Sequence, residues 1–333
     1  MSENPLISII IPVYNIVGRL PVLLDDLERQ DYDNLEIIVF DDCSDDTRGG
    51  ETIKEYLSRR RFAQYTLLRG ESNRGVAFAR NRGLEAAQGE FVAFVDGDDR
   101  VERNYISSLY STLCSVQSDY ASCGYVWYDE TKRLEQPHPL NVFDTKPESI
   151  LSARILNTCE ISHIACLFKK DFLTRYDLKF PEGCSAGEDM EFILKFLCHG
   201  RGAFISDCLY TYVQHDLMGS RQNVINKERK FSRYRDHAYA QVRQACYIIH
   251  HAEGKPRRLA QDMLFPNACQ CVLSVFAMCG DRTRYDKLLA SKRLRQNLWA
   301  AWRSFLYKPE RFIRSIFALF FPNLYWNKYT RYL

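Results

Sequence analysis

The sequence has no Cys-x-x-Cys pair, although it contains 12 cysteines in 333 residues. The closest two, Cys269 and Cys271, lack the spacing of a zinc site. The segment from Met1 to Pro5 contains neither the positive region nor the apolar region of a signal peptide. We therefore predict a reducing, cytoplasmic location in which most of the cysteines are free thiols that serve as small buried residues.

Long apolar runs and a strong overall charge are also missing. The longest apolar run of the C-terminal stretch covers residues 316–321, far short of the ~20 residues that span a bilayer. The net charge is only +3, but residues 293–333 carry +7 and residues 1–292 carry −4. A slightly acidic body argues against nucleic acid as a partner.

The first hundred residues alternate between short apolar runs and helical patterns. Strands are predicted at 7–13, 35–40, 65–68 and 90–95, and helices at 19–30, 47–59 and 73–87. Such alternation predicts an α/β fold, a Rossmann-like, mostly parallel sheet flanked by helices. At 333 residues, the chain is long enough for a second domain or a substantial appendage.

Two of these strands end in acid clusters, and the prediction of a ligand site rests on the cluster after the fourth strand. There the run Phe91–Val95 breaks into Asp96-Gly97-Asp98-Asp99. Ligands of open α/β sheets bind beyond the carboxyl ends of the strands. Clustered carboxylates suit Mg²⁺ or Mn²⁺, especially when substrate phosphates complete the shell. The alternative for an isolated cluster is a solvated polar turn.

The helix that opens at Asn73 offers a second ligand-binding feature. Its first N–H groups, with Arg74 or Arg80, could contact a pyrophosphate. Taken alone, Arg80 could instead be a charge on the helix surface.

Five motifs then occur in order along the chain. They are Pro12-Val13-Tyr14-Asn15, Asp41-Asp42-x-Ser44-x-Asp46, Asn73-x-Gly75, Ala79-Arg80-Asn81-x-Gly83 and Phe94-Val95-Asp96-Gly97-Asp98-Asp99. Together they resemble the family 2 glycosyltransferases of the GT-A fold, the large bacterial group that builds surface polysaccharides such as O-antigen and capsule. The resemblance is specific over residues 6–105 and looser to about 220. Cys43 stands where the family usually has glycine.

The resemblance implies an inverting, metal-dependent hexosyl- or N-acetylhexosaminyltransferase that uses a nucleotide-sugar donor, with UDP as the expected nucleotide. Asp98 would bind Mn²⁺ or Mg²⁺, Asp96 would meet the ribose or the metal, and Asp99 would buttress the site or face the sugar. Donor-binding roles fall on Pro12, Tyr14, Asn15, Asp41, Asp42, Asn73, Gly75, Arg80, Asp96 and Gly97.

The second half of the chain supplies candidates for the acceptor side. A helix is predicted over 187–199 with Glu188 and Asp189 in its first turn, where acids also act as simple helix caps. By resemblance, Asp189 is the catalytic base and Glu188 supports it. His215 follows a predicted strand and is a third metal ligand, a diphosphate contact or a plain surface histidine. His163 is interpreted as a satisfied histidine, with acceptor binding as the alternative.

From residue 226 the pattern changes to long helices at 226–252, 257–279 and 282–304. We therefore predict a catalytic domain over 1–225 and a helical C-terminal region over 226–333, a candidate for self-association. The last stretch mixes aromatic and basic residues, which is typical of an interfacial helix at the inner face of the cell membrane. Packing on the body or on another subunit is the alternative.

This tail favours a glycan or an undecaprenyl-diphosphate-linked oligosaccharide as the acceptor. Two other functions are alternatives. A sugar-phosphate nucleotidyltransferase would need a Gly-rich basic loop after the first strand, and residues 12–19 fit that poorly. A non-catalytic, membrane-associated assembly module would have no need of the acids at 96, 98 and 189.

Overall fold

The structure is a computed structural model that describes residues 4–16, 18–45, 53–60, 62, 64–142, 144–215, 227–300 and 317–330. The chain forms two compact units. The first comprises residues 1–150, 159–183 and 199–221, and the second comprises 151–158, 184–198 and 222–333. The predicted boundary at 225/226 stays a prediction, because the units interleave along the sequence and the segments 151–158 and 184–198 group with the C-terminal helices.

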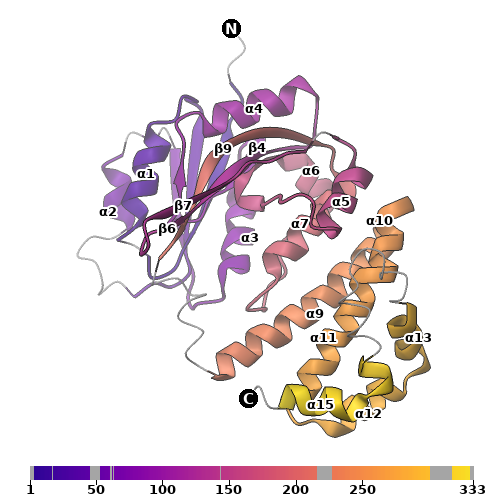
Figure 1. The fold of residues 1–333 in the computed structure, drawn as a ribbon. Coiled ribbons are helices and arrows are strands. Elements are labelled where there is room, and N and C mark those ends of the chain that lie inside the picture. Colours follow the sequence, from indigo (N-terminus) through magenta and orange to yellow (C-terminus); the bar gives the residue numbers. More distant parts are fainter. Residues whose placement is uncertain are drawn as a thin grey trace. The chain divides into compact units, whose positions relative to one another are not determined.

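The first unit is built around a nine-stranded sheet of order β3-β2-β1-β4-β8-β6-β9-β5, with β7 paired to β6 (Figure 1). The strands are β1 (Ile7–Val13), β2 (Leu35–Asp41), β3 (Gln64–Arg69), β4 (Phe91–Phe94), β5 (Arg100–Val101), β6 (Tyr120–Asp129), β7 (Leu134–His138), β8 (Cys166–Lys169) and β9 (Gly202–Gln214). The helices that accompany them are α1 (Leu20–Glu28), α2 (Ile53–Ser58), α3 (Val76–Ala86), α4 (Tyr105–Ser115), η2 (His163–Ala165) and α6 (Lys170–Arg175).

Strands β3, β2, β1 and β4 pair in parallel. Strands β1, β2 and β4 are buried along their whole length, which explains why they are mostly apolar in the sequence. Two polar residues within these strands, Ser8 and Glu36, bind each other through a buried hydrogen bond. Their carboxyl ends meet at one edge of the sheet, so the acids that follow β2 and β4 lie on the same side. The predicted alternation of strands and helices is therefore confirmed in this half.

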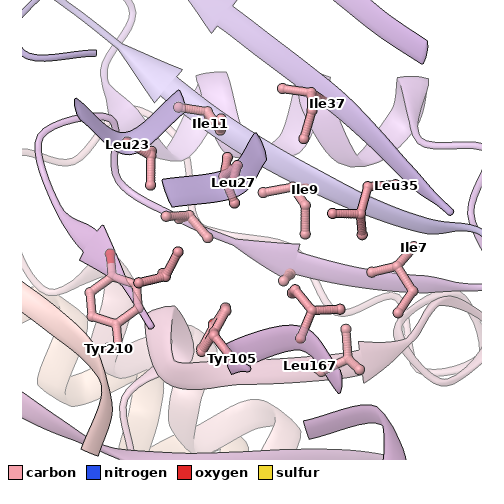
Figure 2. Packing of buried hydrophobic residues seen from close by; sticks show 14 of the residues in the cluster. Ile7, Ile9, Ile11, Leu23, Leu27, Leu35, Ile37, Tyr105, Leu167 and Tyr210 are labelled. Atoms are coloured by element: carbon pink, nitrogen blue, oxygen red, sulfur yellow. The ribbon is translucent and has the colours of Figure 1, made fainter. Parts of the chain in front are cut away.

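Alternate residues of β1 face opposite helical layers. Ile7, Ile9 and Ile11 join α1, α2 and α4 in one large core cluster, part of which is seen in Figure 2. The opposite face carries Ile10, whose methyl Cγ2 lies so close to Gly83 of α3 that a Cβ there would approach it to 2.4 Å. Each fully buried Ile or Leu contributes about 1.5–3 kcal/mol, so these two layers hold the carboxyl edge of the sheet rigidly.

The other half of the sheet is mixed. Strand β8 runs antiparallel to β4 and β6, while β9 returns parallel to β6 and antiparallel to β5. Residues 129–148 are polar and contain proline, a composition that predicts a loop. That prediction is wrong for β7, which pairs antiparallel with the end of β6. Strand β7 is mostly exposed and contains Pro137, so it has no apolar alternation and exists because β6 offers it an edge.

The C-terminal helices belong to the second unit. They are α9 (Lys227–His251), α10 (Gly254–Leu259), the π-helix η3 (Ala260–Leu264), α11 (Phe265–Met278), α12 (Arg282–Ala290), α13 (Lys292–Ala300) and α15 (Pro322–Thr330). Two further helices, α5 (Pro147–Ile155) and α7 (Glu188–His199), lie mostly in this unit. Within the described ranges no helix is both long and apolar enough to span a bilayer.

The helix expected over 282–304 is broken. Asp281 caps α12 by accepting the Arg284 N–H, and Ser291 leaves helical geometry with ψ 119° before α13 begins. A small core of α11, α12, α13 and α15 forms around Leu273, Tyr285 and Leu298. The break therefore lets two short helices pack their apolar faces where one long helix would leave one of them exposed.

Candidate active site at the carboxyl edge of the sheet

The loop after β2 is held by the side chain of Asp41. One of its oxygens accepts the Ser44 N–H at 2.9 Å, and the other accepts Arg69 Nη1 at 2.8 Å. Arg69 lies opposite Asp41 in the register of β2 and β3 and also donates to the Ser44 carbonyl. Cys43 has φ 64°, in the left-handed region that favours glycine. A buried carboxylate thus holds a strained turn in place.

The loop after β1 packs on the same turn. The Asn15 N–H donates to Ser44 Oγ, and Asn15 Oδ1 accepts the Asp45 N–H, both at 2.9 Å. Asn15 itself has φ 54°. Pro12 is buried near the end of β1, whereas the Tyr14 side chain is 46% exposed. Of these predicted donor contacts, Tyr14 is therefore open to a ligand, whereas Pro12 is not.

Asp42 lies at the start of α3. Its carboxylate accepts the Arg74 N–H at 3.0 Å and the Gly75 N–H at 2.6 Å, and Asn73 Oδ1 accepts the same Gly75 N–H at 3.1 Å. The sequence suggested that these N–H groups could receive a pyrophosphate. In the structure, a carboxylate of the chain occupies them, as expected for an anion at a helix N-terminus.

The turn after β4 packs tightly on the end of β1. A Cβ on Gly97 would lie 3.1 Å from Ile16 Cδ1 and 3.3 Å from the Pro12 carbonyl oxygen, so only glycine fits comfortably. Arg80 of α3, which is 3% exposed, donates from Nη2 to Asp96 Oδ1 at 2.6 Å. Its guanidinium also faces the Phe180 ring at 5.1 Å. Arg80 is thus a buried partner of Asp96 and not a helix-surface charge.

Asp98 pairs with His215, which follows the last residue of β9. Asp98 Oδ2 lies 2.7 Å from His215 Nε2, and the His215 side chain is 1% exposed. Within the described part of the chain, Nδ1 of His215 is buried and has no hydrogen-bond partner. The fold therefore brings together two residues that lie 117 positions apart. The contact argues against a plain surface histidine, and the metal and diphosphate roles of His215 stay predictions.

Asp99 is buried and joins the acidic turn to β9. Its oxygens accept the Tyr210 hydroxyl at 2.5 Å and the Val213 N–H at 2.8 Å, and the Asp96 N–H donates to the same Tyr210 oxygen at 3.2 Å. Burial, followed by the nearby charges of Asp96 and Asp98, raises the pKa of Asp99 well above its usual value. These contacts favour the buttressing role over a contact with the sugar.

Asp98 and His215 carry oxygen and imidazole ligands that Mn²⁺ accepts, and Asp98 is partly open to solvent at 15%. Across the described ranges, no three His, Cys, Asp or Glu side chains gather into a metal site. Asp98 and His215 supply two ligands, so a cation bound there would need substrate phosphates or water for the rest of its shell, as is usual for Mg²⁺.

The predicted acid pair lies in the second unit. Glu188 and Asp189 begin α7, and Asp189 is exposed, with one oxygen accepting the Met190 N–H at 2.6 Å. Their catalytic roles stay predictions.

Three residues near this edge received no role from the sequence, although Asn81 belongs to the fourth motif. Arg69 pairs with Asp41, Tyr210 holds Asp99, and Asn81 exchanges two hydrogen bonds with the Phe180 backbone at 2.8 and 2.9 Å. Arg69 could have been found, because it ends the strand next to the one that Asp41 ends. Tyr210 could not, because it lies within an ordinary apolar strand.

A parallel half-sheet with paired acids at its carboxyl edge defines an α/β protein whose acids lie where open sheets of this kind bind their ligands. The family model described as glycosyl transferase family 2 matches residues 8–175. The chain therefore belongs to glycosyl transferase family 2, as the five motifs predicted.

Relatives and solved structures agree with this assignment. The chain is 32% identical over 215 residues to the uncharacterized glycosyltransferase EpsJ of Bacillus subtilis, a match that covers 62% of this chain and 61% of that protein. A crystal structure of residues 1–349 of Staphylococcus aureus TarS with UDP-GlcNAc is similar at a TM-score of 0.66 and 20% identity, covering 89% of this chain and 81% of that chain. The expected GT-A-type fold with C-terminal helices is thereby confirmed.

A more distant structure is that of the mannosyltransferase PcManGT from Pyrobaculum calidifontis, in complex with GDP-Man and Mn²⁺. It is similar at a TM-score of 0.54 and 19% identity, and covers 96% of this chain and 88% of that chain.

Proposed function

We propose that this chain is an inverting glycosyltransferase that moves a sugar from a UDP-sugar to a hydroxyl group in the biosynthesis of a bacterial surface polysaccharide. The contact between Asp98 and His215 carries the proposal, because it joins the acidic turn after β4 to the end of β9 at the ligand-binding edge. The nucleotide sugars in the TarS and PcManGT complexes support a nucleotide-sugar donor, and UDP rests on the TarS likeness.

On this proposal Asp98 and His215 would hold Mn²⁺ or Mg²⁺, and a bound cation would stabilise the negative charge of the leaving diphosphate. The Asp41 and Asp42 loops would receive the nucleoside. Asp189 would accept the proton of the attacking hydroxyl group at its carboxylate, with Glu188 beside it. Attack opposite the departing diphosphate inverts the anomeric centre, so an α-linked donor gives a β-linked product.

The acceptor is proposed to be a glycan or an undecaprenyl-diphosphate-linked oligosaccharide, reached by a cytoplasmic enzyme at the membrane surface. An exposed apolar group supports this location. Trp299, Phe320, Phe321 and Leu324 are 51–60% exposed, and the Trp299 and Phe320 rings lie 6.3 Å apart. Exposed Lys292, Arg295 and Lys328 share these segments, and such mixtures bind anionic lipid surfaces.

Two substitutions test the chemistry. Asp189→Asn should leave UDP-sugar affinity within about twofold and remove most turnover, because a lost general base typically costs 10²–10⁴-fold. Asp98→Ala should weaken Mn²⁺-dependent binding of the donor. We expect a UDP-release assay across donor sugars to identify one substrate, and calorimetry with and without Mn²⁺ to separate the two variants. Full turnover by Asp189→Asn, or cation-independent donor affinity in the unmodified enzyme, would refute the respective assignment.

A further inference from the structure

The segment that carries the acid pair Glu188–Asp189 is attached to helix α9 on both sides of the pair. Before the pair, the Ser185 N–H and hydroxyl both donate to Asp236 Oδ2, at 2.9 and 2.7 Å. After the pair, Glu191 is 2% exposed and accepts Arg243 Nε at 2.8 Å.

Between these two contacts, Gly187 lies directly on the helix. It has φ 86°, and a Cβ added to it would lie 2.8 Å from the Cβ of Ala240. Only glycine adopts this backbone conformation without strain, and only a small residue at position 240 leaves room for the chain. The Gly187 carbonyl also accepts the Glu191 N–H and so starts α7.

Asp236, Ala240 and Arg243 are spaced by four and three residues, so they form one stripe along α9. Both α7 and α9 belong to the second unit (Figure 1). Burial alone would raise the pKa of Asp236, but hydrogen bonds from Ser185 and Arg235 outweigh it and lower the pKa. The Asp236 side chain that accepts both Ser185 hydrogen bonds is therefore an ionised carboxylate, whose hydrogen bonds are stronger than those of a neutral acceptor.

We propose that this stripe of α9 positions the acid pair, so that the C-terminal helical region is part of the machinery of the transferase and not an appendage to it. The inference rests on the proposed function, in which Asp189 is the base. Asp236, Ala240 and Arg243 touch no substrate in this scheme; they are positioning residues that set where the Asp189 carboxylate lies. A displacement of about 1 Å at a reacting group can cost 10²-fold in rate.

The test compares Asp236→Ala, which removes the acceptor, with Asp236→Asn, which keeps one oxygen for Ser185. We expect Asp236→Ala to lower kcat about 10- to 100-fold while donor affinity by calorimetry stays within about twofold, and Asp236→Asn to recover most of the loss. Tyr239→Ala is the matched control, because Tyr239 lies on α9 outside the stripe and is 39% exposed; it should behave as the unmodified enzyme. Ser185→Ala removes only the exposed hydroxyl contact, so it reports a smaller loss of kcat even if Asp236→Ala fails to fold.

A double variant separates this inference from the function beneath it. If Asp236 acts only through Asp189, then Asp189→Asn with Asp236→Ala should be no slower than Asp189→Asn alone. If Asp189→Asn is inactive while Asp236→Ala and Ser185→Ala both turn over normally, the positioning role is refuted and the proposed function stands. If Asp189→Asn is fully active, the assignment of the base is refuted, and the positioning role with it.

Discussion

The pair formed by Arg80 and Asp96 can be measured by a double-mutant cycle. Their contact is 2.6 Å, and the side chains are 4% and 24% exposed. Coulomb's law gives about 4 kcal/mol for unit charges 4 Å apart at an effective dielectric constant of about 20. The loss of water around Arg80 offsets part of this, and hydrogen bonds to charged groups contribute about 1.5–3 kcal/mol net. We therefore expect a coupling energy of about 2 kcal/mol between Arg80→Ala and Asp96→Ala.

The single variant Arg80→Ala should cost about 3 kcal/mol in unfolding free energy, because it leaves Asp96 unpaired and also removes the packing on Phe180. The Asp96 side chain is 24% exposed, so water can solvate its unpaired charge. The loss of unfolding free energy therefore stays at the low end of the values for breaking a buried ion pair.

The assay has to report on the first unit alone, since a chain of two units need not unfold in one step. Hydrogen exchange of peptides from β4 and α3 in increasing urea gives the local free energies directly. A coupling below about 0.5 kcal/mol, the usual scatter of independent sites, would show that Arg80 contributes packing and not charge.

Two further predictions concern the same unit. Burial, followed by the charge of Arg80, lowers the pKa of His163 well below its usual 6.5. Below about pH 6.5 the unfolded chain therefore binds a proton that the folded chain does not, and the free energy of unfolding should fall by up to ~1.4 kcal/mol per pH unit. His163→Gln should reduce that slope in urea titrations from about pH 5 to 7.5. Gly83→Ala should lower the free energy of unfolding by about 1–3 kcal/mol despite the better helix propensity of alanine, since the new methyl would meet Ile10 at 2.4 Å. Adding Ile10→Ala removes that clash, so the same measurement should show a favourable coupling between the two substitutions.

Most of the parallel half of the sheet was predictable because β1, β2 and β4 are buried on both faces. Each of these three strands therefore appears as a mostly apolar run, and the acids at the ends of β2 and β4 mark the carboxyl edge. A meeting of Asp98 and His215 was only one of three alternatives that the family resemblance left open, since nothing in the local sequence of His215 says which strand end it will face.

The remainder depended on contacts that no local pattern records. Strand β7 has the composition of a loop and is a strand only because β6 lies beside it. The N–H groups at the start of α3 were expected to face a pyrophosphate, but Asp42 reaches them from the end of β2. In both cases a long-range partner decides the outcome, and sequence periodicity carries no information about such partners.

The distribution of charge at the carboxyl edge explains why the proposed reaction would need a cation. Five acids gather there, and each already has its own partner within the chain: Asp41 with Arg69, Asp42 with two backbone N–H groups, Asp96 with Arg80, Asp98 with His215, and Asp99 with Tyr210. Both arginines are therefore engaged by carboxylates.

Among the described residues of this edge, the groups that neutralise these acids are already committed to them, so we expect a bound cation to balance much of the charge of an approaching diphosphate. A divalent ion held at Asp98 would supply that balance, because Asp98 is partly exposed and its partner His215 carries an imidazole that Mn²⁺ accepts as a ligand. If His215→Gln bound the UDP-sugar with unchanged affinity and unchanged Mn²⁺ dependence, the ion would have to be held elsewhere, and this account of the edge would be wrong.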